Sequence, residues 1–165
     1  MKRIKLFLLF LSVASLSFAQ SPRLQAEGEI SGVAVSIDYG APSVKGRQIW
    51  GGLEQYGKVW RAGANENTTV SFDSDVLVDG NELSAGKYGF FIIPNEEGDW
   101  TVILNNKNDG WGAYSYNEKE DALRIEVTPD FVNDVQEQLE YSVGEDSIDF
   151  AWEKVRISIS VEPVE

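Results

Sequence analysis

Apolar side chains alternate with polar or small ones in segment after segment of this chain, and this period of two limits how it can fold. Residues 33–39 are the clearest case, because Val33, Val35, Ile37 and Tyr39 share one face. Such alternation is typical of strands that bury one face.

Roughly nine to ten segments of this kind follow at regular spacing with turn residues between them, which is typical of a sandwich or barrel. We therefore expect an all-β fold, a single-domain antiparallel β-sandwich of the jelly-roll or a similar type with very little helix. Residues 88–93 are apolar on both faces, which predicts a strand in the middle of a sheet. The pair Glu153-Lys154 predicts a reversal between the last two strands, and residues 130–138 could form a short helix.

The amino terminus predicts export. Residues 1–5 are basic, residues 6–18 are apolar, and Ser17-Phe18-Ala19 fits the cleavage pattern of a signal peptide. We expect residues 1–19 to be removed and residues 20–165 to form one β-sandwich domain in the periplasm or outside the cell. The apolar run is shorter than the roughly 20 residues that span a bilayer. The chain has no cysteine, so it cannot carry the lipid anchor of a bacterial lipoprotein.

The charge balance argues against nucleic acid as a partner. Removing the signal peptide takes Lys2, Arg3 and Lys5 from the 14 basic side chains and leaves 11, against 27 acidic ones, so the net charge becomes −16. Binding to phosphate needs clustered cations, so nucleic acid and anionic membranes are poor partners for this chain.

The chain contains neither histidine nor cysteine. It therefore lacks the usual nucleophile–base pairs of hydrolases and the usual ligands of zinc, copper and iron. No phosphate-binding glycine loop or EF-hand is present. We expect no cofactor and no metal site, and carboxylate chemistry is the main catalytic chemistry that remains.

Residues 47–72 are the least strand-like part of the chain and supply most of the candidate ligand-binding residues. Exposed aromatic rings stack on sugars or apolar ligands, although the same rings could equally cap the core. Glu66 lies among polar residues where it could act on a ligand, or it could form an ion pair with Arg61 that pins the loop. The candidate residues are Arg47, Trp60, Arg61, Asn65, Glu66, Trp111 and Tyr114.

A series of motifs along the chain resembles the domain-of-unknown-function family 2911 of exported bacterial proteins. The motifs are S-P-R at 21–23, Y-G-A-P-S-V-K-G-R at 39–47, I-W-G at 49–51, W-R-A-G-A-N-E at 60–66, A-G-K-Y at 85–88, W-G-A-Y at 111–114 and D-x-x-R at 121–124. The resemblance covers residues 21–161 and implies an exported, mostly β protein. It implies no catalytic residues.

Three functional hypotheses follow. The first is a non-catalytic module that binds a small molecule, a glycan or a partner through the W-R-A-G-A-N-E motif and residues 111–116. The second is a carboxylate-dependent hydrolase centred on Glu66 with Arg47 or Arg61. The third is a structural envelope protein in which the motif only locks a loop. Exposed aromatics beside the arginines favour the first hypothesis, and a buried, satisfied Arg61–Glu66 pair favours the third.

Overall fold

The computed structural model describes residues 20–164, and the expected signal peptide at residues 1–19 lies outside them. The described chain is all-β apart from one turn of 3₁₀ helix, η1 (Glu118–Glu120), which confirms the predicted fold class. No helix within residues 20–164 is long and apolar enough to cross a membrane. The strands are β1 (Arg23–Ile30), β2 (Val33–Gly40), β3 (Thr68–Phe72), β4 (Val76–Val78), β5 (Asn81–Leu83), β6 (Gly86–Ile93), β7 (Trp100–Asn105), β8 (Asp121–Val127), β9 (Asp130–Val143) and β10 (Ser147–Pro163).

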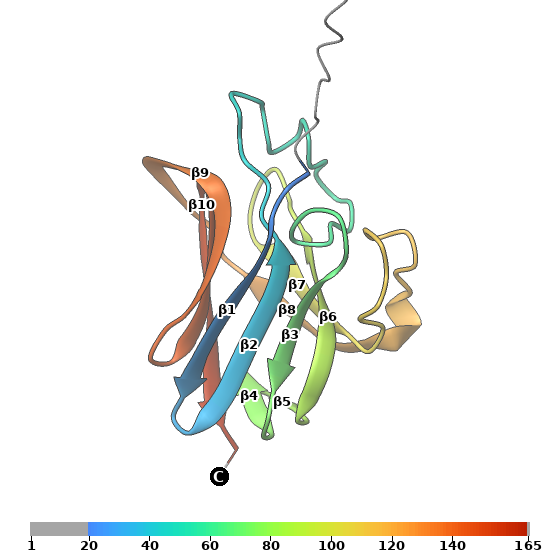
Figure 1. The fold of residues 1–165 in the computed structure, drawn as a ribbon, viewed down its shortest axis with the longest axis vertical. Helices are drawn as coiled ribbons and strands as arrows, with labels where there is room; N and C mark the ends of the chain where they lie inside the picture. Colours follow the sequence, from blue (N-terminus) through green and yellow to red (C-terminus); the bar gives the residue numbers. More distant parts are fainter. Residues whose placement is uncertain (1–19, 165) are drawn as a thin grey trace, which may run out of the picture.

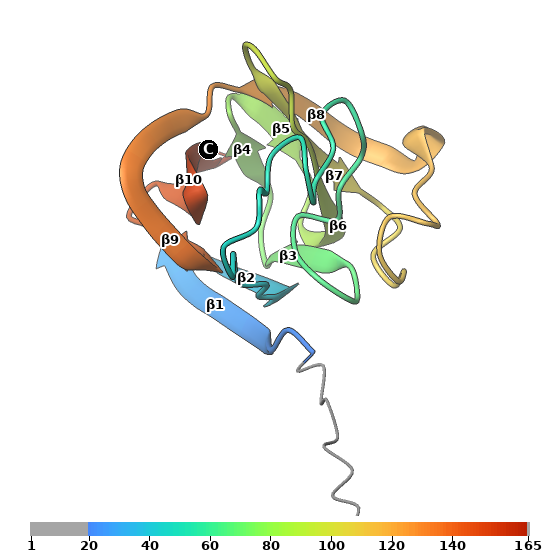
Figure 2. The same cartoon turned by 90° about the horizontal axis from the view of Figure 1, so that it is seen from above.

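The strands form two antiparallel sheets that face each other (Figure 1). One sheet has the order β1-β2-β3-β6-β7-β8 and the other has the order β5-β4-β10-β9. β6 lies between β3 and β7, as its two apolar faces predicted. The edge strands β1 and β9 lie beside each other along one side of the sandwich, as Figure 2 shows from above.

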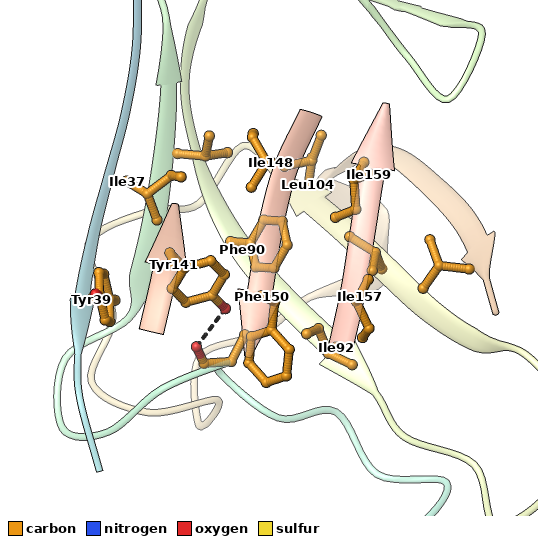
Figure 3. Packing of buried hydrophobic residues seen from close by; sticks show 14 of the residues in the cluster. Ile37, Tyr39, Phe90, Ile92, Leu104, Tyr141, Ile148, Phe150, Ile157 and Ile159 are labelled. Carbon is orange, nitrogen blue, oxygen red and sulfur yellow. Dashed lines mark hydrogen bonds between the residues drawn. The ribbon is translucent and has the colours of Figure 1, made fainter. Parts of the chain in front are cut away.

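β10 reverses its direction within its own length. Ser158 Oγ donates to Asp149 Oδ1 at 2.6 Å, although the two residues are nine positions apart. An extended strand would separate them by about 30 Å. The reversal lies at Glu153, whose φ is 52°, and it matches the turn predicted at 153–154. The two arms stand side by side in Figure 3, one carrying Phe150 and the other Ile157.

The helix considered for residues 130–138 is wrong, because this segment belongs to β9. Its backbone pairs with β10, with Phe131 opposite Val155 and Gln136 opposite Glu153. The backbone of β10 offers hydrogen-bond partners along this segment. Pairing between the two strands therefore outweighs the local preference of residues 130–138 for a helix.

The inward faces of the two sheets pack into one hydrophobic cluster (Figure 3). Within it, four tryptophan rings pack against one another, those of Trp50, Trp60, Trp100 and Trp152. Two of them, Trp50 and Trp60, come from the long β2–β3 connection and not from a strand. The core therefore fixes this connection at one end of the sandwich.

A substitution at Gly40, the last residue of β2, tests how tightly the β2–β3 connection is packed against this strand. A Cβ at Gly40 would lie 2.0 Å from the backbone oxygen of Ala64. Because backbone must move to accept it, we expect Gly40→Ala to lower the free energy of unfolding by at least about 3 kcal/mol in urea titrations. Ala34→Ser, on an exposed position of the same strand, is the control and should change it by less than about 0.5 kcal/mol. A loss below about 1 kcal/mol for Gly40→Ala would contradict the described packing.

Candidate ligand-binding site

The first half of the W-R-A-G-A-N-E motif is a structural clamp. Trp60 is 4% exposed, and its indole nitrogen donates to the oxygen of Gly63 at 3.0 Å. The oxygen of Ala62 accepts two hydrogen bonds, from Thr68 Oγ1 at 3.1 Å and from Tyr141 Oη at 2.8 Å. Thr68 belongs to one sheet and Tyr141 to the other. The motif thus joins the two sheets at this end of the sandwich.

Arg47 and Asn65 also hold backbone in place. The guanidinium of Arg47 donates to the oxygens of Val44 and Ser43 and closes the turn that precedes it. Asn65 Nδ2 donates to the oxygen of Ser21 at 3.2 Å and so fixes the start of the described chain. Both side chains therefore have structural partners, whatever else they contact.

A short backbone bridge joins the end of the motif to the β7–β8 connection. Asn67 N donates to the oxygen of Gly110 at 2.9 Å, and Gly112 N donates to the oxygen of Asn65 at 2.9 Å. Glu66 and Trp111 are the opposed pair of this antiparallel bridge. Opposed residues in this arrangement project to the same face with their side chains close together. Glu66 is exposed and Trp111 is 54% exposed, so both reach solvent.

The β7–β8 connection, residues 106–120, contacts β6 of the six-stranded sheet. Tyr116 packs edge-on against the buried ring of Phe91, with 5.1 Å between ring centroids. Burial first, and then its hydrogen bond to Asp121, raise the pKa of Tyr116 to about 12, so its hydroxyl remains a donor. The carboxylate of Asp121 also accepts from the buried Asn105 at 2.7 Å and from Arg124 at 2.9 Å. This network holds the second end of the connection.

Gly112 is buried beneath two side chains of the site. It is in the left-handed region at φ 63°, and a Cβ there would be 3.2 Å from the Tyr114 ring and 3.9 Å from Arg61 Cδ. Tyr114 and the stem of Arg61 therefore both pack beside this glycine. Tyr114 is 92% exposed. Among residues 20–164, Arg61 has no hydrogen bond and no ion pair, and its Nε is buried without a partner.

The seven candidate residues thus divide into two groups. Arg47, Trp60 and Asn65 hold the fold, whereas four others reach the surface around the 65–67 and 110–112 bridge. We call this second group the motif surface; its members are Arg61, Glu66, Trp111 and Tyr114. The structure shows no ion pair between Arg61 and Glu66. Within residues 20–164, no three acidic side chains are grouped so that they could hold a metal ion.

Glu54 is a residue that sequence reasoning missed. Burial raises the pKa of its carboxyl to about 7, and the positive charges of Arg61 and then Arg47 act in the opposite direction. Glu54 lies in a glycine-rich turn that two backbone hydrogen bonds close. Gly51 N donates to the oxygen of Glu54, and Glu54 N donates to the oxygen of Ile49. The sequence shows only one acid among many, and no local pattern marks it as partly buried.

The raised pKa of Glu54 predicts a pH-dependent stability. Between about pH 4.5 and pH 7 the folded state binds a proton that the unfolded state releases, so this group lowers stability as the pH rises. Glu54→Gln mimics the protonated carboxyl and should be more stable than the parent at pH 8 by about 1–3 kcal/mol. The two proteins should differ little at pH 4.5, measured by urea unfolding at both values. An equal difference at both pH values would contradict the burial of this carboxyl.

Comparison with known proteins places the chain in a family but gives no activity. No curated protein and no solved structure shows significant similarity to it. One family model matches residues 21–161, nearly the whole of the described chain, and its members are described as proteins of unknown function. This match confirms the resemblance drawn from the motifs: the chain belongs to the DUF2911 family.

Proposed function

We propose that this protein is an exported, non-catalytic binding module whose ligand contacts the motif surface. The observation that carries the proposal is the exposure of Trp111 and Tyr114 on a connection that is held at both ends. An exposed tryptophan and an exposed tyrosine three residues apart give a stacking surface for the rings of an oligosaccharide, the ligand class that we propose. Glu66 and Arg61 beside them supply an acceptor and donors for polar groups.

The support of the connection matters for affinity. Ordering a loop on binding costs free energy, and a loop that is already fixed avoids much of that cost. The bridge to residues 65–67 and the hydrogen bonds to Asp121 fix this one before any ligand arrives. A connection that is fixed in this way keeps the rings of Trp111 and Tyr114 exposed to a ligand.

A titration followed by NMR tests the proposal. The protein is titrated with neutral and acidic oligosaccharides, and the indole signal of Trp111 is identified by its absence in Trp111→Phe. We expect this signal to shift, and we expect Trp111→Ala and Tyr114→Ala each to weaken binding by about tenfold or more, since each removes a stacked ring. Their melting temperatures should change little, because both side chains are exposed.

Phe131 is the matched control for this experiment. It is an exposed aromatic residue on β9, where it is 60% exposed and contacts Trp100. Phe131→Ala should leave the affinity unchanged. If no oligosaccharide shifts the Trp111 signal, or if Phe131→Ala weakens binding as much as Trp111→Ala, the proposal is wrong.

A carboxylate-dependent hydrolase centred on Glu66, with Arg47 or Arg61, is the second candidate. Glu54 is the second acid it would use, because its carboxyl lies within reach of the charges of Arg61 and Arg47 and its pKa of about 7 suits a proton donor near neutral pH. Product analysis of the same oligosaccharides after incubation distinguishes the two. Cleavage that is lost in Glu66→Gln would support the hydrolase, whereas binding without cleavage supports the module. Absence of both would support a purely structural envelope protein.

A further inference from the structure

We propose that the ligand carries a carboxylate that binds the guanidinium of Arg61, so that the preferred ligand is a short oligosaccharide containing uronic acid. This inference rests on the proposed binding function and narrows its ligand class. Its starting point is Arg61, the one arginine within residues 20–164 whose side chain has no hydrogen-bond or ion-pair partner.

The side chains of the other four arginines within residues 20–164 all have partners, unlike that of Arg61. Arg23 donates to the carboxylate of Asp38 and to three backbone oxygens, Arg124 pairs with Asp121, and Arg47 and Arg156 donate to backbone oxygens. Each of these guanidinium groups therefore has a role in the fold. Arg61 has no such role, although its stem is partly buried beside Gly112 and its Nε has lost contact with water.

The position of Arg61 leaves its outer nitrogens available. Nε is buried, but the two terminal nitrogens neither bond to the protein nor lie among its buried unpaired atoms, so they face solvent. A guanidinium presents a planar fork that matches the two oxygens of a carboxylate. A carboxylate ligand would provide an acceptor for this fork.

Glu54 does not already fill this role. Its charge acts on Arg61, but the two side chains form no ion pair within 4.0 Å among the described residues. Because its carboxyl titrates near pH 7, it carries only part of its negative charge at neutral pH. An incoming carboxylate therefore meets a guanidinium that is not neutralised by a close partner.

The surroundings of Arg61 favour a sugar ring over a simple organic acid. The Tyr114 ring lies beside the same glycine as Arg61 Cδ, so a ring stacked on Tyr114 can direct a substituent toward the guanidinium. Glu66, beside Trp111 on the bridge, can accept hydrogen bonds from sugar hydroxyls. The chain from Gln20 onward has a net charge of −16, which repels long polyanions and favours short oligomers.

The test compares each acidic ligand with its uncharged methyl ester. Trisaccharides of galacturonate, glucuronate and mannuronate are each used as the free acid and as the methyl ester, in about 0.15 M salt, where fields beyond about 8 Å are screened. Affinities are measured by calorimetry for the parent protein, Arg61→Met and Lys107→Met. Lys107→Met is the matched control, because Lys107 is an exposed cation on the same connection, 3.4 Å from Asp109.

We expect at least one free acid to bind about tenfold or more tightly than its ester, the size of effect that charge-assisted hydrogen bonds give. Arg61→Met should remove this preference while leaving the melting temperature and the affinity for the ester nearly unchanged. Lys107→Met should keep the preference.

Three results overturn the inference and are distinguishable from failure of the proposed function. If acid and ester bind equally, or if Lys107→Met removes the preference as fully as Arg61→Met, then Arg61 is not the carboxylate site, although binding at the motif surface stands. If esters and neutral sugars bind but no free acid does, the inference about Arg61 is wrong, while the proposed binding function stands. If nothing in either panel binds, both proposals are wrong.

Discussion

The backbone oxygen of Ala62 is the point on which the arrangement of this end of the molecule depends. It accepts from Thr68 on β3 and from Tyr141 on β9, so one atom ties the two sheets to the motif (Figure 3 shows the bond from Tyr141). Ala62 has a φ of 50°, a conformation that costs an alanine roughly 1–2 kcal/mol. The two buried hydrogen bonds and the packing of Trp60 offset that cost and keep the chain in this turn.

The position of the aromatic connection follows from this clamp. Because residues 60–64 are fixed against both sheets, residues 65–67 are placed where they can pair with residues 110–112. The other end of the connection is fixed independently by Asp121, which bonds Tyr116, Asn105 and Arg124. Two polar networks on different strands therefore hold Trp111 and Tyr114 at the surface. Large apolar side chains that a fold keeps exposed often mark interaction sites.

Alternation of apolar and polar residues was enough to predict most strands, because a sheet with one buried face demands that period. Apolar residues on both faces predicted the central place of β6, and the pair Glu153-Lys154 predicted the reversal of β10. Sequence reasoning failed at residues 130–138, where pairing with β10 decides the structure. It could not decide which tryptophans are buried. Trp60 and Trp111 both lie outside the strands, and only the three-dimensional packing separates them. Glu54 was missed for the same reason, since its burial comes from backbone bonds within a turn.

Hydrogen exchange at two backbone amides shows whether the motif clamps the aromatic connection in place. Asn67 N and Gly112 N donate across the bridge, so their exchange reports directly on whether it stays closed. We expect both to exchange slowly, approaching the protection of Val102, a buried residue in the middle of β7. Exchange of either amide at the rate of an open, solvated loop would contradict this clamp.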